Sequence, residues 1–166
     1  MIDAAYVQTM ARYNRWQNKS LYAAAEGIGD VERRRDRGAF FGSIHATLNH
    51  LLWADMIWMS RWSDVPAPSF GGKDSVRLCE DWADLVRERR ALDRVILDWA
   101  ANLAPDALAG DLAWFSGMLQ RAFIKPRWLL VTHFFNHQTH HRGQVHAMLT
   151  AAGAKPEATD LGFMEA

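Results

Sequence analysis

The most diagnostic part of the sequence is one long segment, Pro126-Arg-Trp-Leu-Leu-Val-Thr-His-Phe-Phe-Asn-His-Gln-Thr-His-His-Arg-Gly-Gln-Val-His-Ala-Met-Leu-Thr-Ala-Ala152. Proline at a first helical position and glycine directly after the last one, here Gly153, are typical boundaries of a helix. The segment contains five of the seven histidines of the chain. Residues four apart lie on one helical face, so His133, His137 and His141 are expected to form a single stripe.

Three further segments are predicted to be helical. The first runs from about Asp3, a candidate N-cap, to about Glu26, and the second begins near Ser43 and ends by about Trp62. The third starts after Ser75 and shows apolar residues spaced alternately three and four apart once Arg89 is counted in the series, which is typical of a helix in a bundle. These are Leu78, Trp82, Leu85, Leu92, Ile96, Trp99 and Leu103. The sequence therefore predicts an all-α, four-helix bundle.

Two connections in this bundle are long enough to have structure of their own. Between the third and fourth helices, the runs 111–115 and 118–124 flank Ser116-Gly117 and predict a small β-hairpin. Between the second and third helices, residues 63–75 can reach roughly 43 Å, whereas a helix of about twenty residues spans roughly 30 Å. The second and third helices can therefore run parallel, although bundles are built both ways.

Composition narrows the class of protein. With 166 residues and 49% hydrophobic content, residues 1–166 are expected to form a single domain with a full core. A single cysteine, Cys79, with no leader segment and no apolar run of membrane length predicts a soluble, cytoplasmic protein with no membrane partner. Nineteen basic residues balance nineteen acidic ones, so no nucleic-acid partner is expected. The local basic run 32–37 is interpreted as a solvated loop.

Two histidines on one helix face are a candidate metal site, but metal sites generally need at least three protein ligands. The third must come from another helix, and His45 and His50 are the remaining histidines. His50 shares its face with an inward-looking set of residues, whereas His45 lies about 140° away around the helix. We therefore choose His50. The residues that share its face are Ala46, Trp53, Ala54 and Ile57.

Spacing alone leaves open which pair on the last helix binds a metal, since His137 belongs both to the pair with His133 and to the pair with His141. Other metal chemistries have no matching motif: no Glu-x-x-His motif of a di-iron bundle occurs, and position 138 is Gln where a zincin has Glu. Two hydrogen-bonded histidines without a metal are the plainer interpretation of such a pair.

Several other polar residues lie on predicted helices. Arg89 interrupts the apolar series of the third helix, which suggests a buried ion pair with Asp55 or Asp93, although a solvent-exposed arginine is the alternative. Arg142 is expected at a helix interface, and Gln144 lies near the histidine stripe, where it can orient a ligand. No carboxylate is placed to act as a general base, and Cys79 is interpreted as a packing residue. The sequence thus leaves the catalytic residues unassigned.

The sequence also resembles a known family. The stretches Tyr13-Asn-Arg-Trp-Gln-Asn18, Gly38 to Asp55 with its Leu48-Asn-His50, and Phe135-Asn-His-Gln-Thr-His-His-Arg-Gly-Gln144 closely resemble the DinB family of bacterial proteins. The resemblance implies a four-helix bundle with up-down-down-up connectivity. It also implies a divalent metal, usually zinc or nickel, held by three histidines, which here are His50, His137 and His141.

Members of that family with known activity use thiol cofactors. The resemblance therefore implies a metal-dependent enzyme of the thiol S-transferase type that acts on a small-molecule substrate with a low-molecular-weight thiol. A metal-dependent hydrolase and a non-catalytic metal-bound stress-response module are the alternatives. Trp128 and Phe135 are predicted to project away from His137, and an additional apolar face on this helix predicts a homodimer. The alternative is that the hairpin or the C-terminal tail covers this face.

Overall fold

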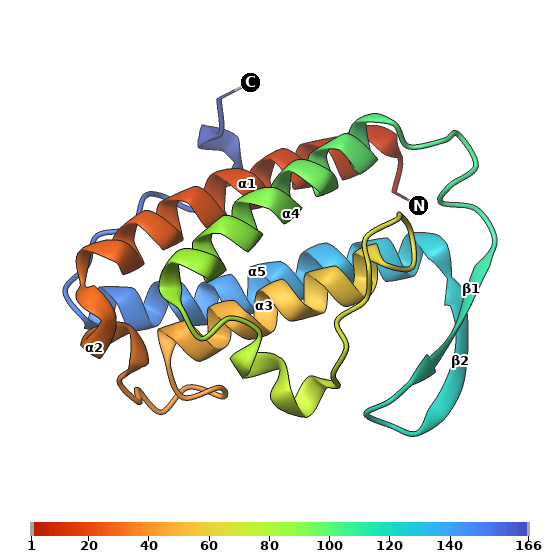
Figure 1. Cartoon of the computed structure of the whole chain (residues 1–166). Coiled ribbons are helices and arrows are strands. Elements are labelled where there is room, and N and C mark those ends of the chain that lie inside the picture. Colours follow the sequence, from red (N-terminus) through yellow and green to blue (C-terminus); the bar gives the residue numbers. More distant parts are fainter. Residues whose placement is uncertain (1, 166) are drawn as a thin grey trace.

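The computed structural model describes residues 2–165 and consists mostly of helices (Figure 1). Four long helices lie side by side, as predicted, and a two-stranded antiparallel sheet extends from one end. The long helices are α1 (Ala4–Gly27), α3 (Ile44–Met59), α4 (Trp82–Ala101) and α5 (Arg127–Ala151). The shorter elements are α2 (Gly29–Arg34), the 3-10 helices η1 (Gly72–Arg77) and η2 (Leu161–Phe163), and the strands β1 (Asp111–Ser116) and β2 (Arg121–Pro126).

Side-chain caps fix where three of the long helices begin. Asp3 accepts a hydrogen bond from the amide of Tyr6 at 2.8 Å, and Ser43 accepts one from Ala46 at 3.1 Å, so both predicted starts are confirmed. The predicted start of the third helix after Ser75 is wrong. Asp81 caps this helix by accepting from the amide of Ala83 at 2.7 Å, so α4 begins at Trp82, and the preceding residues form η1 instead.

The last helix has nearly the predicted limits. Pro126 is the N-cap rather than the first helical residue, because its ψ of 134° is extended and it still belongs to β2. At the other end, Gly153 adopts a φ of +83°, which glycine reaches without a steric cost. This turn lets the amide of Ala154 bond to the carbonyl of Leu149 at 3.0 Å, which ends the helix.

The interpretation of residues 32–37 as a solvated loop is wrong for their first part. Residues 29–34 form α2, and Arg33 is buried. Its guanidinium donates to the carbonyl of Ala25 at 3.0 Å and lies 4.3 Å from the centre of the Trp82 ring. Arg33 therefore joins α2 to α1 and α4, and an ordered partner replaces the solvent that was expected around it.

The predicted hairpin is confirmed, with a later start of its second strand. β2 begins at Arg121 because residues 117–120 form the turn, which includes Gln120 at a φ of +51°. Trp114 pairs with Phe123 across the strands, and their rings stack with centroids 5.2 Å apart. Phe115 and Ile124 are exposed, so one face of the hairpin packs on the bundle and the other faces solvent.

The connection between α3 and α4 runs back along α3. The Trp53 indole donates to the carbonyl of Phe70 at 3.0 Å, and further along the connection the amide of Cys79 donates to the side chain of Asn49 at 2.7 Å. The connection thus returns toward the start of α3 before α4 begins. Consequently α3 and α4 run in the same direction, which Figure 1 shows, and η1 is held against α3.

The core lies between the four long helices and is closed by large apolar side chains that include Leu48, Leu85 and Phe134. Phe135, which was expected on an exposed apolar face, is fully buried and contacts the ring of Tyr6 on α1, with centroids 6.1 Å apart. The apolar face is therefore covered within the chain at this point, which removes Phe135 from the argument for a homodimer. Within residues 2–165, no helix combines the length and the apolar composition that membrane crossing requires.

Candidate metal centre

Packing of α3 against α5 brings together the three histidines selected from the sequence. One ring nitrogen from each of His50, His137 and His141 lies within 4.8 Å of the other two. The closest pair is His50 Nε2 and His137 Nε2, at 3.4 Å. His137 and His141 follow one another by a single helical turn, and His50 approaches them from α3.

The remaining histidines lie outside this cluster. His45 is buried with its Nε2 3.1 Å from the carbonyl oxygen of Cys79. His133 is exposed and places its ring against Trp58. His140 is exposed beside the cluster, and His146 is half-buried and lines a separate small cavity. Of the two pairs that spacing allowed on α5, the structure brings His137 and His141, not His133, to His50.

A hydrogen-bond chain fixes the tautomer of His50. The Ser75 hydroxyl donates its only proton to the carbonyl of Gly72 at 2.7 Å. Its oxygen lies 2.9 Å from His50 Nδ1, so it accepts a hydrogen bond from this nitrogen. The proton of the neutral ring is then on Nδ1, and the lone pair on Nε2 is directed toward His137.

Gln144 fixes the tautomer of His141 in the same way. The amide oxygen of Gln144 lies 2.8 Å from His141 Nδ1, which must donate to it. The amide nitrogen of Gln144 lies 3.4 Å from His140 Nε2 and can donate to that nitrogen. Both contacts agree with one orientation of the amide group. His141 therefore also has a free lone pair on Nε2.

His137 is the member of the cluster that lacks a partner of this kind. Its Nδ1 is buried and has no hydrogen-bond partner within residues 2–165. Its Nε2 lies 3.4 Å from His50 Nε2, which presents a lone pair, so a neutral His137 satisfies this contact by carrying its proton on Nε2 and donating to His50. The buried Nδ1 of His137 then has a lone pair without a donor, which costs free energy. A cation held by His50 and His137 would take the place of the shared proton.

Burial keeps these rings neutral. Desolvation, reinforced by the neighbouring histidines, lowers the pKa of His50 to about 4 and that of His137 to about 3. Burial also lowers the pKa of His141, against the opposing effect of its hydrogen bond to Gln144. At neutral pH all three rings therefore present a lone pair, which is the form that binds metals.

The donor set and spacing fit a divalent metal. Two imidazole nitrogens bound to one tetrahedral zinc ion at about 2.0–2.1 Å lie roughly 3.3–3.4 Å apart. The distance between His50 Nε2 and His137 Nε2 is 3.4 Å. Within residues 2–165, no carboxylate or cysteine joins the three histidines. Three protein ligands with a remaining open position are typical of catalytic rather than structural zinc sites.

Aromatic side chains cover the cluster. The Phe41 ring stacks on His50 with centroids 4.0 Å apart and lies 5.3 Å from the ring of His141. Phe41 is placed by a tight turn in which the amide of Gly42 bonds to the carbonyl of Ala39 at 2.8 Å. Gly42 adopts a φ of +77°, a conformation that favours glycine. The site is consequently shielded on the side of the His50 ring.

Sequence reasoning did not identify Phe41 and Ser75 as parts of this site. Both lie in connections, where no helical periodicity indicates which side chain faces inward. The predicted position of Gln144 near the histidine stripe is confirmed, because that residue follows His141 by three positions on the same helix. It orients a histidine rather than a bound ligand.

The predicted buried ion pair is present and lies apart from the histidines. Arg89 contacts both candidate partners, Asp55 at 2.7 Å and Asp93 at 2.9 Å. Arg142 also lies at the expected helix interface, where it donates to the side-chain oxygen of Asn14 on α1. Asp55 is thus engaged in an ion pair, which agrees with its exclusion as a general base.

Cys79 is half-buried, and burial raises the pKa of its thiol to about 11. A thiol with this pKa is protonated at neutral pH and is a weak nucleophile. This agrees with the interpretation of Cys79 as a packing residue.

Comparison with known proteins identifies one family. A model described as the DinB family matches residues 1–166, the whole chain. Comparison with the curated proteins and with the solved structures gives no match.

Proposed function

The chain belongs to the DinB family, and on this basis we propose that His50, His137 and His141 bind a divalent metal ion in a metal-dependent enzyme of the thiol S-transferase type. The observation that carries the proposal is the convergence of three neutral imidazoles, two of which have their lone pairs fixed by Ser75 and Gln144. Zinc is our first choice and nickel the second, since imidazole suits both.

The metal, when bound, would lower the pKa of a thiol or a water molecule and so supply a nucleophile at neutral pH. The residues of the chain prepare the site for this chemistry. Ser75 holds the Nδ1 proton of His50, and Gln144 holds that of His141, so neither ring can turn its lone pair away. Phe41 limits the access of water to the His50 side.

An external thiol is favoured over one from the protein. Cys79 is the only cysteine of the chain, and its thiol has a raised pKa and lies outside the histidine cluster. A low-molecular-weight thiol would take the open position, and a small electrophile would be the second substrate. This substrate class is carried over from the DinB relatives, since the three histidines alone do not select a thiol over water.

His140 adjoins the cluster, with its ring centroid 4.8 Å from that of His141, but its Nε2 accepts from Gln144 and so is not free to act as a base. Within the described residues no carboxylate joins the cluster, so the general base is not assigned. A hydrolase that activates water at the same site is the enzymatic alternative, and a non-catalytic metal-bound stress-response module is the third.

The test is a comparison of thiol conjugation and hydrolysis by zinc-loaded protein. Bacillithiol, mycothiol, glutathione and cysteine are each offered with a chlorinated or epoxide electrophile, and ester and amide substrates are tested in parallel. We expect metal-dependent conjugation that is lost in His50→Ala. Turnover of esters or amides alone would support the hydrolase, and no metal-dependent turnover in either panel would support the non-catalytic module.

Three further properties belong to this proposal. The bundle is assigned the up-down-down-up connectivity of the family, with which the parallel course of α3 and α4 is compatible. The protein is proposed to act in the cytoplasm, without membrane or nucleic-acid partners, as a homodimer.

With Phe135 buried, the exposed Phe115 and Ile124 of the hairpin are the better candidates for an apolar dimer contact. Sedimentation at micromolar concentration tests the dimer, and a strict monomer would contradict it.

A further inference from the structure

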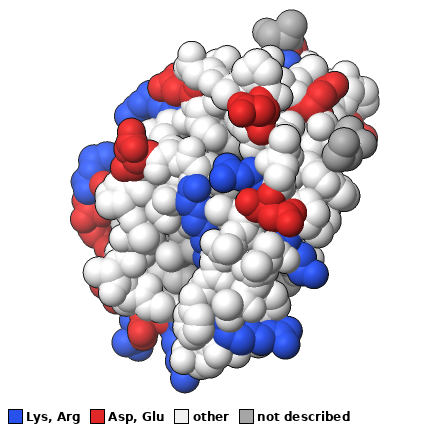
Figure 2. All heavy atoms as spheres, turned by 90° about the vertical axis from the view of Figure 1, so that its right-hand side faces the viewer, with Lys and Arg blue, Asp and Glu red and all other residues white. Residues whose placement is uncertain are grey.

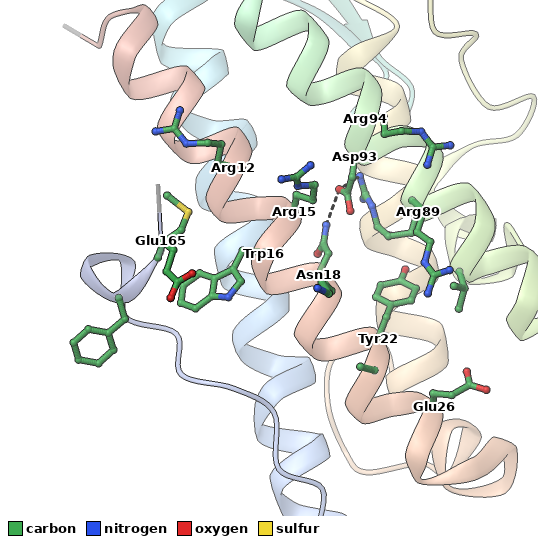
Figure 3. Close-up of a pocket in the computed structure, with 16 residues that line it drawn as sticks. Arg12, Arg15, Trp16, Asn18, Tyr22, Glu26, Arg89, Asp93, Arg94 and Glu165 are labelled. Atoms are coloured by element: carbon green, nitrogen blue, oxygen red, sulfur yellow. Dashed lines mark hydrogen bonds and ion pairs between the residues drawn. The ribbon is translucent and has the colours of Figure 1, made fainter.

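A second candidate site lies between α1 and α4. An open cavity of about 1210 Å³ follows the groove between these two helices, and residues 163–165 of the C-terminal tail line it as well (Figure 3). The histidines of the metal centre are not among its lining residues. α1 and α4 form this groove, whereas α3 and α5 carry the metal ligands, so the two sites are separate.

The groove is positively charged although the chain is neutral overall. Six basic side chains line it, against three acidic ones, Glu26, Asp93 and Glu165, which gives a formal excess of three positive charges. The basic residues are Arg12, Arg15, Lys19, Arg89, Arg90 and Arg94.

Five of these six cations have no acidic partner. Arg89 is neutralised by Asp55 and Asp93, but none of the other five forms an ion pair within residues 2–165. Lysines and arginines elsewhere, such as Lys125 and Arg127, are also without an ion pair in the part of the chain that the structure describes. What distinguishes the groove is that five unpaired cations line one cavity.

The cations come from both walls of the groove. Arg12, Arg15 and Lys19 are spaced three and four apart, so they follow one face of α1 over roughly 10 Å. Arg90 and Arg94 are four apart on α4, which is joined to α1 by the hydrogen bond from Asn18 to Asp93 at 2.9 Å (Figure 3). A single monovalent anion would not engage both rows, whereas an anion with several charged groups would.

The floor of the groove contains polar atoms without partners. Tyr22 and Arg89 both line the cavity and are more than nine-tenths buried. The hydroxyl of Tyr22 and the Nε of Arg89 have no hydrogen-bond partner within the described residues. Both atoms are closed off from solvent, so they lie beneath the floor of the groove, and the exposed cations above them are the groups that a ligand would contact.

Aromatic surface accompanies the charges. Trp16 is half-buried and lines the groove between the positions of Arg15 and Lys19, and Phe163 of η2 is exposed in the same cavity. Guanidinium groups bind phosphate oxygens in a forked, paired geometry, and indole rings stack on flat heterocycles. Charged and aromatic groups thus match the two halves of a nucleotide.

We propose that the groove between α1 and α4 binds a nucleoside di- or triphosphate, with its phosphates between Arg12, Arg15, Lys19, Arg90 and Arg94 and its base on Trp16. A small ligand is favoured over a nucleic acid, since the C-terminal tail lies beside the groove. Away from the groove, at the end of the molecule drawn in Figure 2, charges of both signs are mixed.

Calorimetric titration of the full chain with ATP, tripolyphosphate and a short single-stranded oligonucleotide tests this proposal. We expect ATP to bind with a stoichiometry of one, and the variant Arg15→Gln/Arg90→Gln to bind it at least about tenfold more weakly. Both arginines are exposed, so the fold should persist, which circular dichroism checks. Lys125→Gln removes an exposed charge outside the groove and should leave binding unchanged.

Two further variants locate the ligand. Trp16→Leu should weaken the binding of ATP more than that of tripolyphosphate, because only ATP has a base to stack. His137→Ala should bind ATP like the original chain, which separates this groove from phosphate binding at a metal. No heat with ATP at low salt, equal affinity of the double arginine variant, or loss of binding in His137→Ala would each overturn the proposal. Tighter binding of the oligonucleotide than of ATP would overturn the assignment to a small ligand.

Discussion

Two clusters of polar side chains lie between the helices, and they differ in how their electrostatic requirements are met. In the ion-pair cluster, Arg89 contacts Asp55 and Asp93, and Asp93 also accepts a hydrogen bond from Asn18 at 2.9 Å. In the histidine cluster, three neutral rings converge, and within residues 2–165 no carboxylate or cysteine joins them.

This difference assigns a structural role to the ion-pair cluster and a ligand-binding role to the histidine cluster. In the ion-pair cluster the charge of Arg89 is neutralised by carboxylates of the chain itself, so the cluster needs no ion from solution and stabilises the packing of α3 against α4. The histidine cluster has no negative charge to balance a cation, and the buried Nδ1 of His137 has no partner within the described residues. Because neutral imidazoles bind cations and burial opposes protonation of the rings, the histidine cluster is the one prepared for a metal ion.

Replacement of Arg89, the cation that Asp55 and Asp93 share, should produce the largest loss of folding stability. Arg89→Met leaves Asp55 and Asp93 buried without a positive partner, and burial already raises the pKa of Asp55. We expect the free energy of unfolding to fall by about 3–5 kcal/mol. Urea denaturation followed by circular dichroism measures it. A loss below about 1 kcal/mol would mean that the ion-pair cluster is not what stabilises this interface.

Removal of one histidine should abolish metal binding without this loss of stability. His137 contributes the nitrogen nearest to His50, and two ligands hold a metal far less tightly than three. Elemental analysis of untagged His137→Ala should show near-total loss of the metal.

His146→Ala and His133→Ala are the matched controls, since both rings lie outside the cluster and both variants should keep the metal. Retention of the metal in His137→Ala would contradict the assignment of the site. Loss of the metal in His133→Ala would indicate that His133, one helical turn earlier on α5, is a ligand.

Acid should destabilise the metal-free protein through the histidines. The pKa values of His50 and His137 are lowered to about 4 and about 3, below the ordinary value of 6.5. As the pH falls below 6.5 the unfolded chain takes up protons first, so stability decreases toward pH 4. Each histidine contributes at most about 1.4 kcal/mol per pH unit.

Urea midpoints measured at several pH values test this, with His50→Gln/His137→Gln as the comparison. The variant should show a shallower decline with falling pH than the original chain. Identical slopes would contradict the burial of neutral rings in the cluster.

Loss of an orienting hydrogen bond should have a smaller effect. In Gln144→Ala, His141 loses the acceptor that holds its Nδ1 proton, while all three ligands remain. We expect metal affinity to fall by about 10- to 100-fold, with thermal stability nearly unchanged. Competition with a chromophoric chelator measures the affinity. An unchanged affinity would show that packing, including that of Phe41, is sufficient to orient the ring.

Much of this architecture could be predicted from sequence because it depends on local chemistry. The N-caps Asp3 and Ser43, the stop at Gly153 and the spacing of His137 and His141 act within one or two helical turns. The start of α4 could not be predicted in this way, because Asp81 competes with an earlier candidate in the same polar stretch.

Contacts between residues far apart in the sequence could be identified only from the tertiary structure. The prediction that His50 and the residues of its face point inward is wrong in part, because His50 and most of that face are only half-buried, whereas His45 is buried. Helical periodicity also could not determine whether His133 or His141 completes the site. That choice depends on how far α3 is displaced along α5. The burial of Arg33 against Trp82 and of Phe135 against Tyr6 likewise results from the packing of separate elements.

The sequence by itself thus determined the helices, the hairpin, the candidate ligands and the family, because periodicity, capping and motif spacing are properties of neighbouring residues. Only the tertiary structure decided that Ser75 and Phe41 complete the surroundings of His50, that Arg89 bridges two carboxylates, and that basic residues of α1 and α4 line one groove. These contacts join residues far apart in the chain, and the free energy that selects them comes from packing and desolvation that exist only once the helices have met.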